Sequence, residues 1–329
     1  MTDEFRITRR AFNALGVASL LAPCISRAQQ PYPARPVKVV VTYTPGGAND
    51  ISARIYAHLL SQDLNQPFVV ENKPGASGIT GTTYAARSEP DGYTLLLGAG
   101  GTMTINPGLF PKLSYDPLKD FTPIGIVARA PLVLVVSPKL PVKNVRELIA
   151  YAKSKPEGIT FASPGPGTPL HLAGELFTRR TGINAIHIPY RGSAPALNDL
   201  MSGQVDMMFD VLSSSIGFIN GDKLRALAVS SAERSSYLPD VPTAIEQGVK
   251  DFDITSWFGF FAPAGTPPEA IKVLTASLAK AAATPQAREQ LAAMAMDPVT
   301  ADNAALRELV QTEQARWREV IIAAKVKTE

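Results

Sequence analysis

Three glycine-rich turns carry residue types that could bind a small anion. They span residues 44–50, 74–81 and 163–169, and each follows a short run of β-branched or apolar residues. The start of a helix leaves backbone N–H groups without partners, and the helix dipole favours an anion there. Glycine lets a carboxylate approach the backbone, and serine or threonine adds a hydroxyl donor. One such turn is a weak signal, because Gly/Pro turns punctuate every α/β protein. Three together predict a carboxylate site.

The candidate ligand-binding residues come from these turns and from the segments that follow them. They are Pro45, Gly46, Gly47, Asp50, Gly75, Ala76, Ser77, Gly78, Ser163, Gly167, Thr168, His171, Tyr190, Arg191 and Asp210. In the first turn, Asp50 either caps a helix or contacts the ligand. We favour a cap that shapes the loop, because a carboxylate facing a carboxylate would repel it.

Several candidates leave two roles open. His171 either donates to an anion or packs against the neighbouring loop. Arg191, which follows Tyr190 at the end of a strand, either pairs with a second ligand carboxylate or lies solvated at the rim. Asp210 either accepts a hydrogen bond from a ligand amine or hydroxyl, or caps the serine-rich turn after it. Trp257, with its neighbour, either covers the ligand or fills the core.

Signatures of catalysis and metal binding are missing from the sequence. It has no Gly-x-Ser-x-Gly elbow, Walker loop, dinucleotide-binding glycine fingerprint or His-Glu-x-x-His motif. Three histidines and no cysteine after Cys24 argue against a structural zinc site. We therefore expect no catalytic residues, no metal and no cofactor.

The charge balance argues against a nucleic-acid partner. Four of the 32 basic residues and two of the 29 acidic residues lie in residues 1–28, so the remainder holds 28 basic and 27 acidic residues. Phosphate binding needs a basic stripe, and none is visible.

Short strands alternating with helices must position these turns. This order predicts an α/β fold with a mostly parallel sheet covered on both faces. The expected strands are 37–42, 68–71, 93–97, 132–136, 159–162, 185–188, 205–209 and 224–229, and the expected helices include 51–64, 145–153, 170–180 and 194–201. In the last helix, Trp317 recurs at helical spacing with apolar residues and is expected to anchor the core.

The chain is predicted to leave a first α/β unit, build a second and return. Two crossing segments, near residues 124–129 and 254–261, would then form a two-strand hinge. We expect residues 29–127 and 255–329 to form lobe 1 and residues 128–254 to form lobe 2. Two lobes on such a hinge can clamp a ligand between them.

The first 28 residues have the zones of an export signal. Arg9 and Arg10 form a twin-arginine pattern, an apolar stretch follows from Ala14 to Leu21, and small residues close the segment at Ser26 and Ala28. We expect a twin-arginine signal peptide over residues 1–28 and a periplasmic product. The alternative is an amphipathic first helix of a cytosolic protein.

Several motifs resemble those of TctC-like proteins, the substrate-binding subunits of tripartite tricarboxylate transporters, known as Bug proteins in the group where they expanded. The resemblance covers essentially the whole chain after residue 28. It is carried, in order, by Pro45-Gly46-Gly47-x-x-Asp50, Glu71-Asn72-Lys73-Pro74-Gly75, Asp91-Gly92-Tyr93-Thr94, Tyr115-Asp116-Pro117, Gly167-Thr168-Pro169-x-His171, Pro189-Tyr190-Arg191-Gly192, Gly203-Gln204-Val205-Asp206 and Ser256-Trp257-Phe258-Gly259.

This resemblance implies a two-lobed, type II-like periplasmic binding protein with its ligand in the cleft. It also implies that the loops at residues 46–50 and 75–81 hold the ligand carboxylate, while the second lobe selects the ligand. The family's ligands include citrate-like acids, amino acids and aromatic carboxylates, and its partners are transporter membrane subunits. The alternatives are a periplasmic sensor for a membrane receptor, or a small-acid enzyme on the same scaffold.

Overall fold

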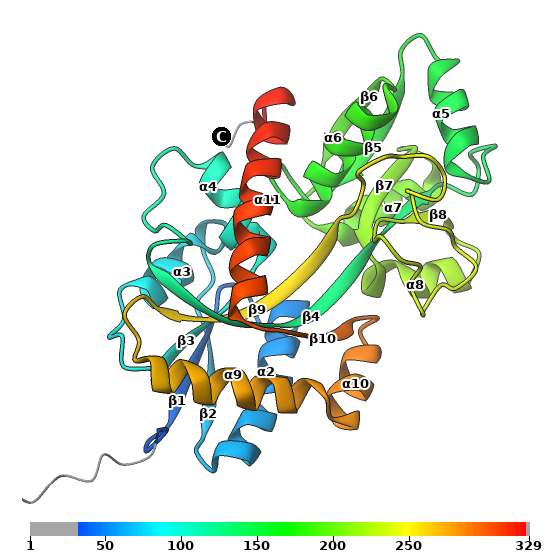
Figure 1. The fold of residues 1–329 in the computed structure, drawn as a ribbon. Coiled ribbons are helices and arrows are strands. Elements are labelled where there is room, and N and C mark those ends of the chain that lie inside the picture. The colour runs from blue at the N-terminus through cyan, green and yellow to red at the C-terminus, as the bar shows by residue number, and fades with distance from the viewer. Residues whose placement is uncertain (1–31, 327–329) are drawn as a thin grey trace, which may run out of the picture.

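The computed structural model describes residues 32–326, so the predicted signal at residues 1–28 lies outside the described residues. Two lobes are joined by the long strands β4 (Phe121–Val136) and β9 (Thr255–Pro263), as Figure 1 shows. This confirms the predicted α/β fold with two lobes and a two-strand hinge. We call the lobe that contains β1–β3 the first lobe and the lobe that contains β5–β8 the second lobe.

The first lobe is built from three strands, the helices that cover them and the C-terminal elements. These are β1 (Val37–Val41), α2 (Ala48–Leu64), β2 (Phe68–Asn72), η1 (Ala76–Gly78), α3 (Ile79–Ala86), β3 (Thr94–Ala99), η2 (Gly101–Ile105), α4 (Asn106–Leu109), α9 (Pro268–Ala282), α10 (Pro285–Ala292), β10 (Asp297–Ala301) and α11 (Asn303–Ala323). The second lobe contains α5 (Val145–Lys153), β5 (Ile159–Ser163), α6 (Pro169–Thr181), β6 (Ala185–Pro189), α7 (Ser193–Ser202), β7 (Met207–Val211), α8 (Leu212–Asn220) and β8 (Arg225–Val229).

The valine run of β1 is buried because helices cover both faces of its sheet. Side chains alternate across a strand, so Val39 packs with α2 and α9 residues such as Tyr56 and Leu274. Val40 points the other way and shares a cluster with Ala85 of α3. β1 pairs in parallel with β2 and with β3, as predicted.

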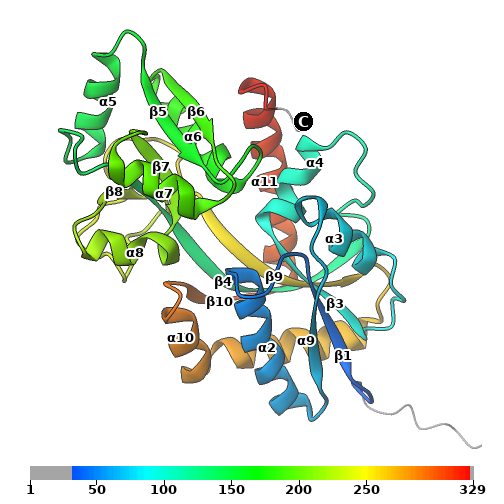
Figure 2. The same cartoon turned by 180° about the vertical axis from the view of Figure 1, so that it is seen from behind.

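The second lobe repeats this arrangement around β5, which pairs in parallel with β6 and β7. Phe161 packs on the α5 and α6 side with Leu148 and Phe177, while Ala162 packs on the α7 side with Leu197. Figure 2 shows the two helical layers of this lobe from behind. Each lobe therefore has its own covered sheet.

The crossing strands differ from the predicted mostly parallel sheet. β9 runs antiparallel to β3 and to β4, and β4 runs antiparallel to β7, β8 and β10. The prediction of a hinge segment at residues 124–129 separate from a strand at 132–136 was also wrong, because β4 is one strand of 16 residues. Its pairing with β9 shifts register at Pro123/Gly125 and at Ile126/Ala128, so the ladder is irregular at two places in the hinge.

Helix α11 stands beside both lobes (Figure 1). Its first half packs through Leu306 and Val310 on the first lobe, and its second half packs through Trp317 and Val320 into the core that contains Phe177. Trp317 is 2% exposed, which confirms its predicted place in the core, but it also lines the cavity described below, which the sequence did not lead us to expect. Among residues 32–326, no helix has the length and apolar character needed to cross a bilayer.

Candidate functional site

A cavity of about 310 Å³ lies between the two lobes and the crossing strands. This volume is in the range of small-molecule sites, roughly 300–1,000 Å³. It is lined from the first lobe by Tyr43, Ala48, Asn49, Ser77, Ala99, Gly100, Gly101, Ile105, Asn106 and Leu109, from the second lobe by Leu132, Pro164, Pro166, Gly167, Thr168, Pro169, Leu170 and Val211, and from the hinge side by Ile254, Thr255, Ser256, Trp257, Phe258, Glu313 and Trp317.

The turn after β1 presents the start of α2 to this cavity. The helix begins at Ala48, three residues earlier than predicted, and its N-cap is Gly47, which offers no side-chain cap. The expectation that Asp50 is the N-cap of this helix was therefore wrong, because Gly47 occupies that position. Asp50 lies in the first turn and reaches back, accepting a hydrogen bond of 3.0 Å from the Gly46 N–H. The first backbone N–H groups of α2 remain available to a ligand.

Asp50 shapes this turn without lining the cavity. It is 3% exposed, and its carboxylate also accepts hydrogen bonds from Arg54 Nε at 2.9 Å and Asn72 Nδ2 at 2.9 Å. Burial pushes the pKa of Asp50 up, but the hydrogen bonds from Arg54, Gly46 and Asn72 outweigh it and hold the pKa below its usual value. Asp50 is thus ionised at neutral pH and fully occupied by its own loop.

Two polar side chains of the first lobe face the cavity with free hydrogen-bonding capacity. Asn49 Oδ1 is buried and has no hydrogen-bond partner among the described residues. The NH2 group of the same amide is a separate hydrogen-bond donor. Burial raises the pKa of Tyr43 to about 12, so its phenol stays protonated and can donate to an anion. The sequence analysis singled out neither residue.

The second loop is held in a left-handed backbone conformation that residues other than glycine rarely adopt. Gly75, Ala76, Ser77 and Gly78 have φ values of 136°, 46°, 54° and 84°. A hydrogen bond of 2.9 Å from Gly78 N to Gly75 O closes the turn, and Asn106 Nδ2 donates to Ser77 O at 3.0 Å. Strain of this kind persists where the surroundings enforce it, often at ligand sites. Of the four residues, Ser77 lines the cavity.

A third first-lobe segment, η2 after β3, was missed. Its turn, Gly98–Gly101, is a glycine cluster at the end of a strand parallel to β1, the same signal that identified the other turns. η2 is a single π-helical turn, a feature frequent at functional sites. Tyr115 OH donates to Thr102 O at 2.6 Å and fixes this turn.

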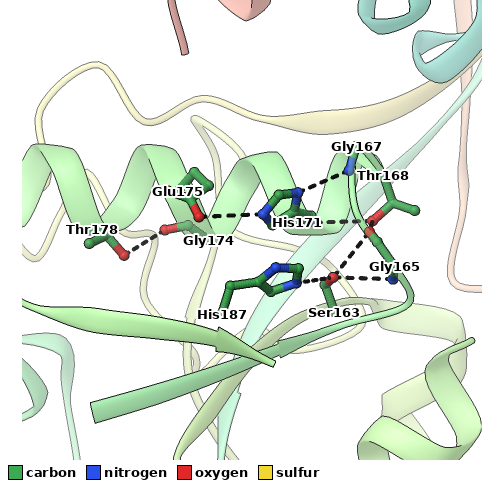
Figure 3. Close-up of polar contacts among 9 residues, drawn as sticks. All are labelled: Ser163, Gly165, Gly167, Thr168, His171, Gly174, Glu175, Thr178 and His187. Atoms are coloured by element: carbon green, nitrogen blue, oxygen red, sulfur yellow. Dashed lines mark hydrogen bonds and ion pairs between the residues drawn. The ribbon is translucent and has the colours of Figure 1, made fainter. Parts of the chain in front are cut away.

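The second-lobe turn is closed by its own hydrogen bonds (Figure 3). Thr168 Oγ1 accepts from His171 N at 3.2 Å and donates to Gly165 O at 2.8 Å. The Gly167 N–H donates to His171 Nδ1 at 3.0 Å, so the proton of a neutral ring is on Nε2, 3.3 Å from Glu175. Gly167 and Thr168 line the cavity, whereas His171 lies behind them, 4% exposed.

His187 stacks on His171 with ring centroids 3.8 Å apart (Figure 3). Its Nε2 is 2.7 Å from Ser163 Oγ, and Ser163 is completely buried. Burial, followed by the neighbouring His171, lowers the pKa of His187 to about 4. Ser163 and His187 therefore support the turn and do not reach the cavity.

The remaining second-lobe candidates also lie outside the cavity lining. Tyr190 OH donates to Asp199 at 2.7 Å, and Arg191 is exposed. Asp210 is fully buried and accepts hydrogen bonds from Ser193 at 2.9 Å and Ser215 at 2.6 Å. Burial raises the pKa of Asp210 despite these bonds. The structure brings Asp210 together with the starts of α7 and α8 and not with the cavity.

Trp257 and Phe258 of β9 both fill the core and line the cavity, so their two predicted roles coincide. Trp257 Nε1 donates to Glu313 Oε2 of α11 at 2.8 Å. Glu313 is 4% exposed; burial raises its pKa, and the Trp257 and Arg316 donors oppose that effect. No sequence pattern singles out Glu313, because it occupies one more polar position on an amphipathic helix.

The cavity therefore has unused donors on the first-lobe side and a mostly apolar body. Among residues 32–326, no group of three or more His, Cys, Asp or Glu side chains could hold a metal ion. The geometry suits non-covalent binding of a small anion whose carboxylate faces α2.

Comparison with known proteins is consistent with this geometry. The TctC model, described as the tripartite tricarboxylate transporter family receptor, matches residues 52–326. Protein BugT of Bordetella pertussis is 39% identical over 291 residues, which cover 88% of this chain and 89% of that protein.

Two solved structures show the same fold. An R. palustris protein with adipate has a TM-score of 0.78 and 35% identity, over 90% of this chain and 99% of that one. MatC from Rhodopseudomonas palustris with bound malate has a TM-score of 0.74 and 34% identity, over 88% of this chain and 100% of that one. The chain therefore belongs to the TctC family, the receptors of tripartite tricarboxylate transporters.

Proposed function

We propose that this protein is a periplasmic solute-binding protein that captures a small organic carboxylate in the cavity between its lobes. The observation that carries this proposal is the start of α2 at the cavity wall, where no side chain caps the first backbone N–H groups and the helix dipole favours an anion; Asn49 of this first turn lines the cavity. Tyr43 and Ser77 add hydroxyl donors to the same wall. The relatives solved with adipate and malate support a carboxylate as the ligand class.

The predicted site residues divide into contacts and supports in this proposal. Ser77, Gly167 and Thr168 line the cavity and contact the ligand. The supports hold the loops or lie at their edges, and they are Pro45, Gly46, Gly47, Asp50, Gly75, Ala76, Gly78, Ser163, His171, Tyr190, Arg191 and Asp210.

The two lobes act as a clamp. We assign residues 29–127 and 255–329 to lobe 1 and residues 128–254 to lobe 2, with β4 and β9 as the hinge. The cavity is lined from both lobes, so a ligand that touches both stabilises the closed form, because only differential contact shifts such an equilibrium.

The bound acid is passed to the membrane subunits of a tripartite tricarboxylate-type transporter, and the protein performs no catalysis. The family description supports the transporter partner. Export uses the twin-arginine pattern at Arg9 and Arg10, within residues 1–28.

Calorimetric titration with small organic acids tests the proposal. Asn49→Ala should weaken binding of any acid that the protein takes by about tenfold, or about 1.4 kcal/mol. Gln62→Ala, an exposed change on the same helix, is the matched control and should leave affinity unaltered. Equal affinity in the folded Asn49 variant would remove the start of α2 from the site.

A further inference from the structure

The described residues that line the cavity include one acidic side chain and no basic one. Among the described residues that line it, Glu313 is the one with a formally charged side chain, and arginine, lysine and histidine are absent from the lining. Apolar side chains make up most of the body, including Leu109, Leu170, Ile254 and Phe258. A group that enters beyond the first-lobe donors therefore meets mainly hydrocarbon, one acid, and the neutral residues Thr255 and Ser256.

At the start of α6, the second lobe has already used several of the donors that an anion would need. At the start of α6, Gly167 N is bound to His171 Nδ1 and His171 N is bound to Thr168 Oγ1. Thr168 N donates to Gly165 O at 3.4 Å, and Pro169 at the first helical position has no N–H. The start of α2, in contrast, has no side-chain cap. The two helix starts that face the cavity are thus not equivalent anion sites.

Glu313 takes up the indole N–H of Trp257 on the hinge side, where Thr255 and Ser256 also line the cavity. Its Oε2 accepts from Trp257 Nε1 at 2.8 Å and lies 3.1 Å from Thr104 Oγ1, while Arg316 Nη2 is 3.3 Å from Oε1. The indole N–H, which could otherwise bind an anion, is therefore occupied. An anion placed here would lie next to a carboxylate that is itself 4% exposed.

A second ligand carboxylate would have no cation to pair with in this cavity. Arg191, the residue predicted from sequence for that pairing, is exposed and outside the lining. Burying a charge without a partner is strongly unfavourable, and the Glu313 carboxyl, which accepts from Trp257 and Arg316, supplies no cation to offset that cost. An uncharged apolar body avoids this cost and buries its surface against the lining.

We infer that the cavity selects a monocarboxylate with an apolar body and rejects a second carboxylate, and that Glu313 is the specificity-determining residue for this rejection. The inference rests on the proposed function, because it takes one carboxylate to be held by the first lobe. It separates this protein from its relatives solved with adipate and malate, which are dicarboxylates.

Calorimetry on the full chain after residue 28 tests this with matched acids. Hexanoate and adipate differ by one terminal carboxylate, as do benzoate and terephthalate. The monocarboxylate of each pair should bind about 100-fold more tightly, equivalent to about 2.8 kcal/mol. Adipate monoamide has the shape of adipate without the second charge, and it should bind within about tenfold of hexanoate.

Two variants then assign the effect to Glu313. Glu313→Gln should narrow the hexanoate-to-adipate affinity ratio by at least about tenfold. Glu308→Gln removes a charge from an exposed position of the same helix and should leave the ratio unchanged. A folded Glu313→Gln protein with the original ratio would overturn the role of Glu313. If that variant does not fold, the monoamide comparison on the unaltered protein decides.

The possible outcomes distinguish a failure of the inference from a failure of the proposed function on which it rests. Adipate that binds as tightly as hexanoate or its monoamide would overturn the selection of monocarboxylates and leave carboxylate binding standing. Failure of all five acids to bind the folded protein would overturn the proposed function, and the inference with it.

Discussion

Replacing Gly78 with alanine tests whether the strained second loop forms part of the site. Gly78 has a φ of 84°, a left-handed conformation that costs a residue with a Cβ roughly 1–2 kcal/mol. The added Cβ would lie 2.5 Å from Thr102 Cγ2 and 3.2 Å from Thr42 Oγ1, so the loop or η2 must shift. Overpacking of this kind costs a further ~1–3 kcal/mol.

The shift should reach the ligand through Ser77, the neighbour of Gly78 that lines the cavity. We expect Gly78→Ala to weaken carboxylate binding at least about tenfold, or about 1.4 kcal/mol. The assay is calorimetric titration, with scanning calorimetry of the free protein to confirm that the variant is folded.

Gly182→Ala is the matched control. Gly182 also has a positive φ, 64°, but its Cβ would meet nothing within 4 Å, and it ends α6 away from the cavity lining. It should lose stability by the backbone cost alone and keep its affinity. Unchanged affinity in a folded Gly78→Ala protein would refute the reasoning and remove this loop from the site. Gly47 differs from Gly78 in both respects, because its φ is −85° and an added Cβ would meet nothing within 4 Å. Neither the backbone cost nor the overpacking cost of Gly78→Ala applies at Gly47.

Three further predictions concern stability, closure and export. Burial lowers the pKa of His187 to about 4, so the unfolded chain binds more protons than the folded chain between pH 6.5 and 4. The free energy of unfolding should therefore decrease as the pH is lowered from 6.5 to 4. The ring is partly exposed, so we expect a loss of about 1–2 kcal/mol; urea unfolding at both pH values should show it, and His187→Gln should reduce it. Small-angle scattering should record a smaller radius of gyration with a saturating acid long enough to touch both lobes, whereas an unchanged radius would favour a preformed pocket. Changing Arg9 and Arg10 to lysine should leave precursor in the cytoplasm, and a normal periplasmic yield would show that another export route carries the protein.

The fold was largely predictable from the sequence because local patterns settle it. The valine run of β1 and the alternation of strands with helices predict the parallel part of each lobe, β1 with β2 and β3 and β5 with β6 and β7. The direction of β9 was not predictable in this way, since a strand pattern does not reveal which neighbour it pairs with. The same applies to the single long β4, in which the predicted gap between the crossing segment at 124–129 and the strand at 132–136 is itself part of a paired strand.

The site was predictable where backbone chemistry defines it and not where packing does. The turns around Gly47, Ser77 and Thr168 were identified from glycine, hydroxyl and helix-start signals, and they do meet at one cavity. Glu313 was missed because its role depends on Trp257, which is 56 residues away in sequence. Asp210 carried a polar signal at a strand end, yet its partners Ser193 and Ser215 enclose it.

Native mass spectrometry of the protein purified from the periplasm without refolding tests the central claim most directly. We predict one bound small organic acid per chain, released on denaturation and lost or weakened in the Asn49→Ala variant. A chain that carries no acid, and that none of the tested acids binds after purification, would contradict the account of a carboxylate-binding protein.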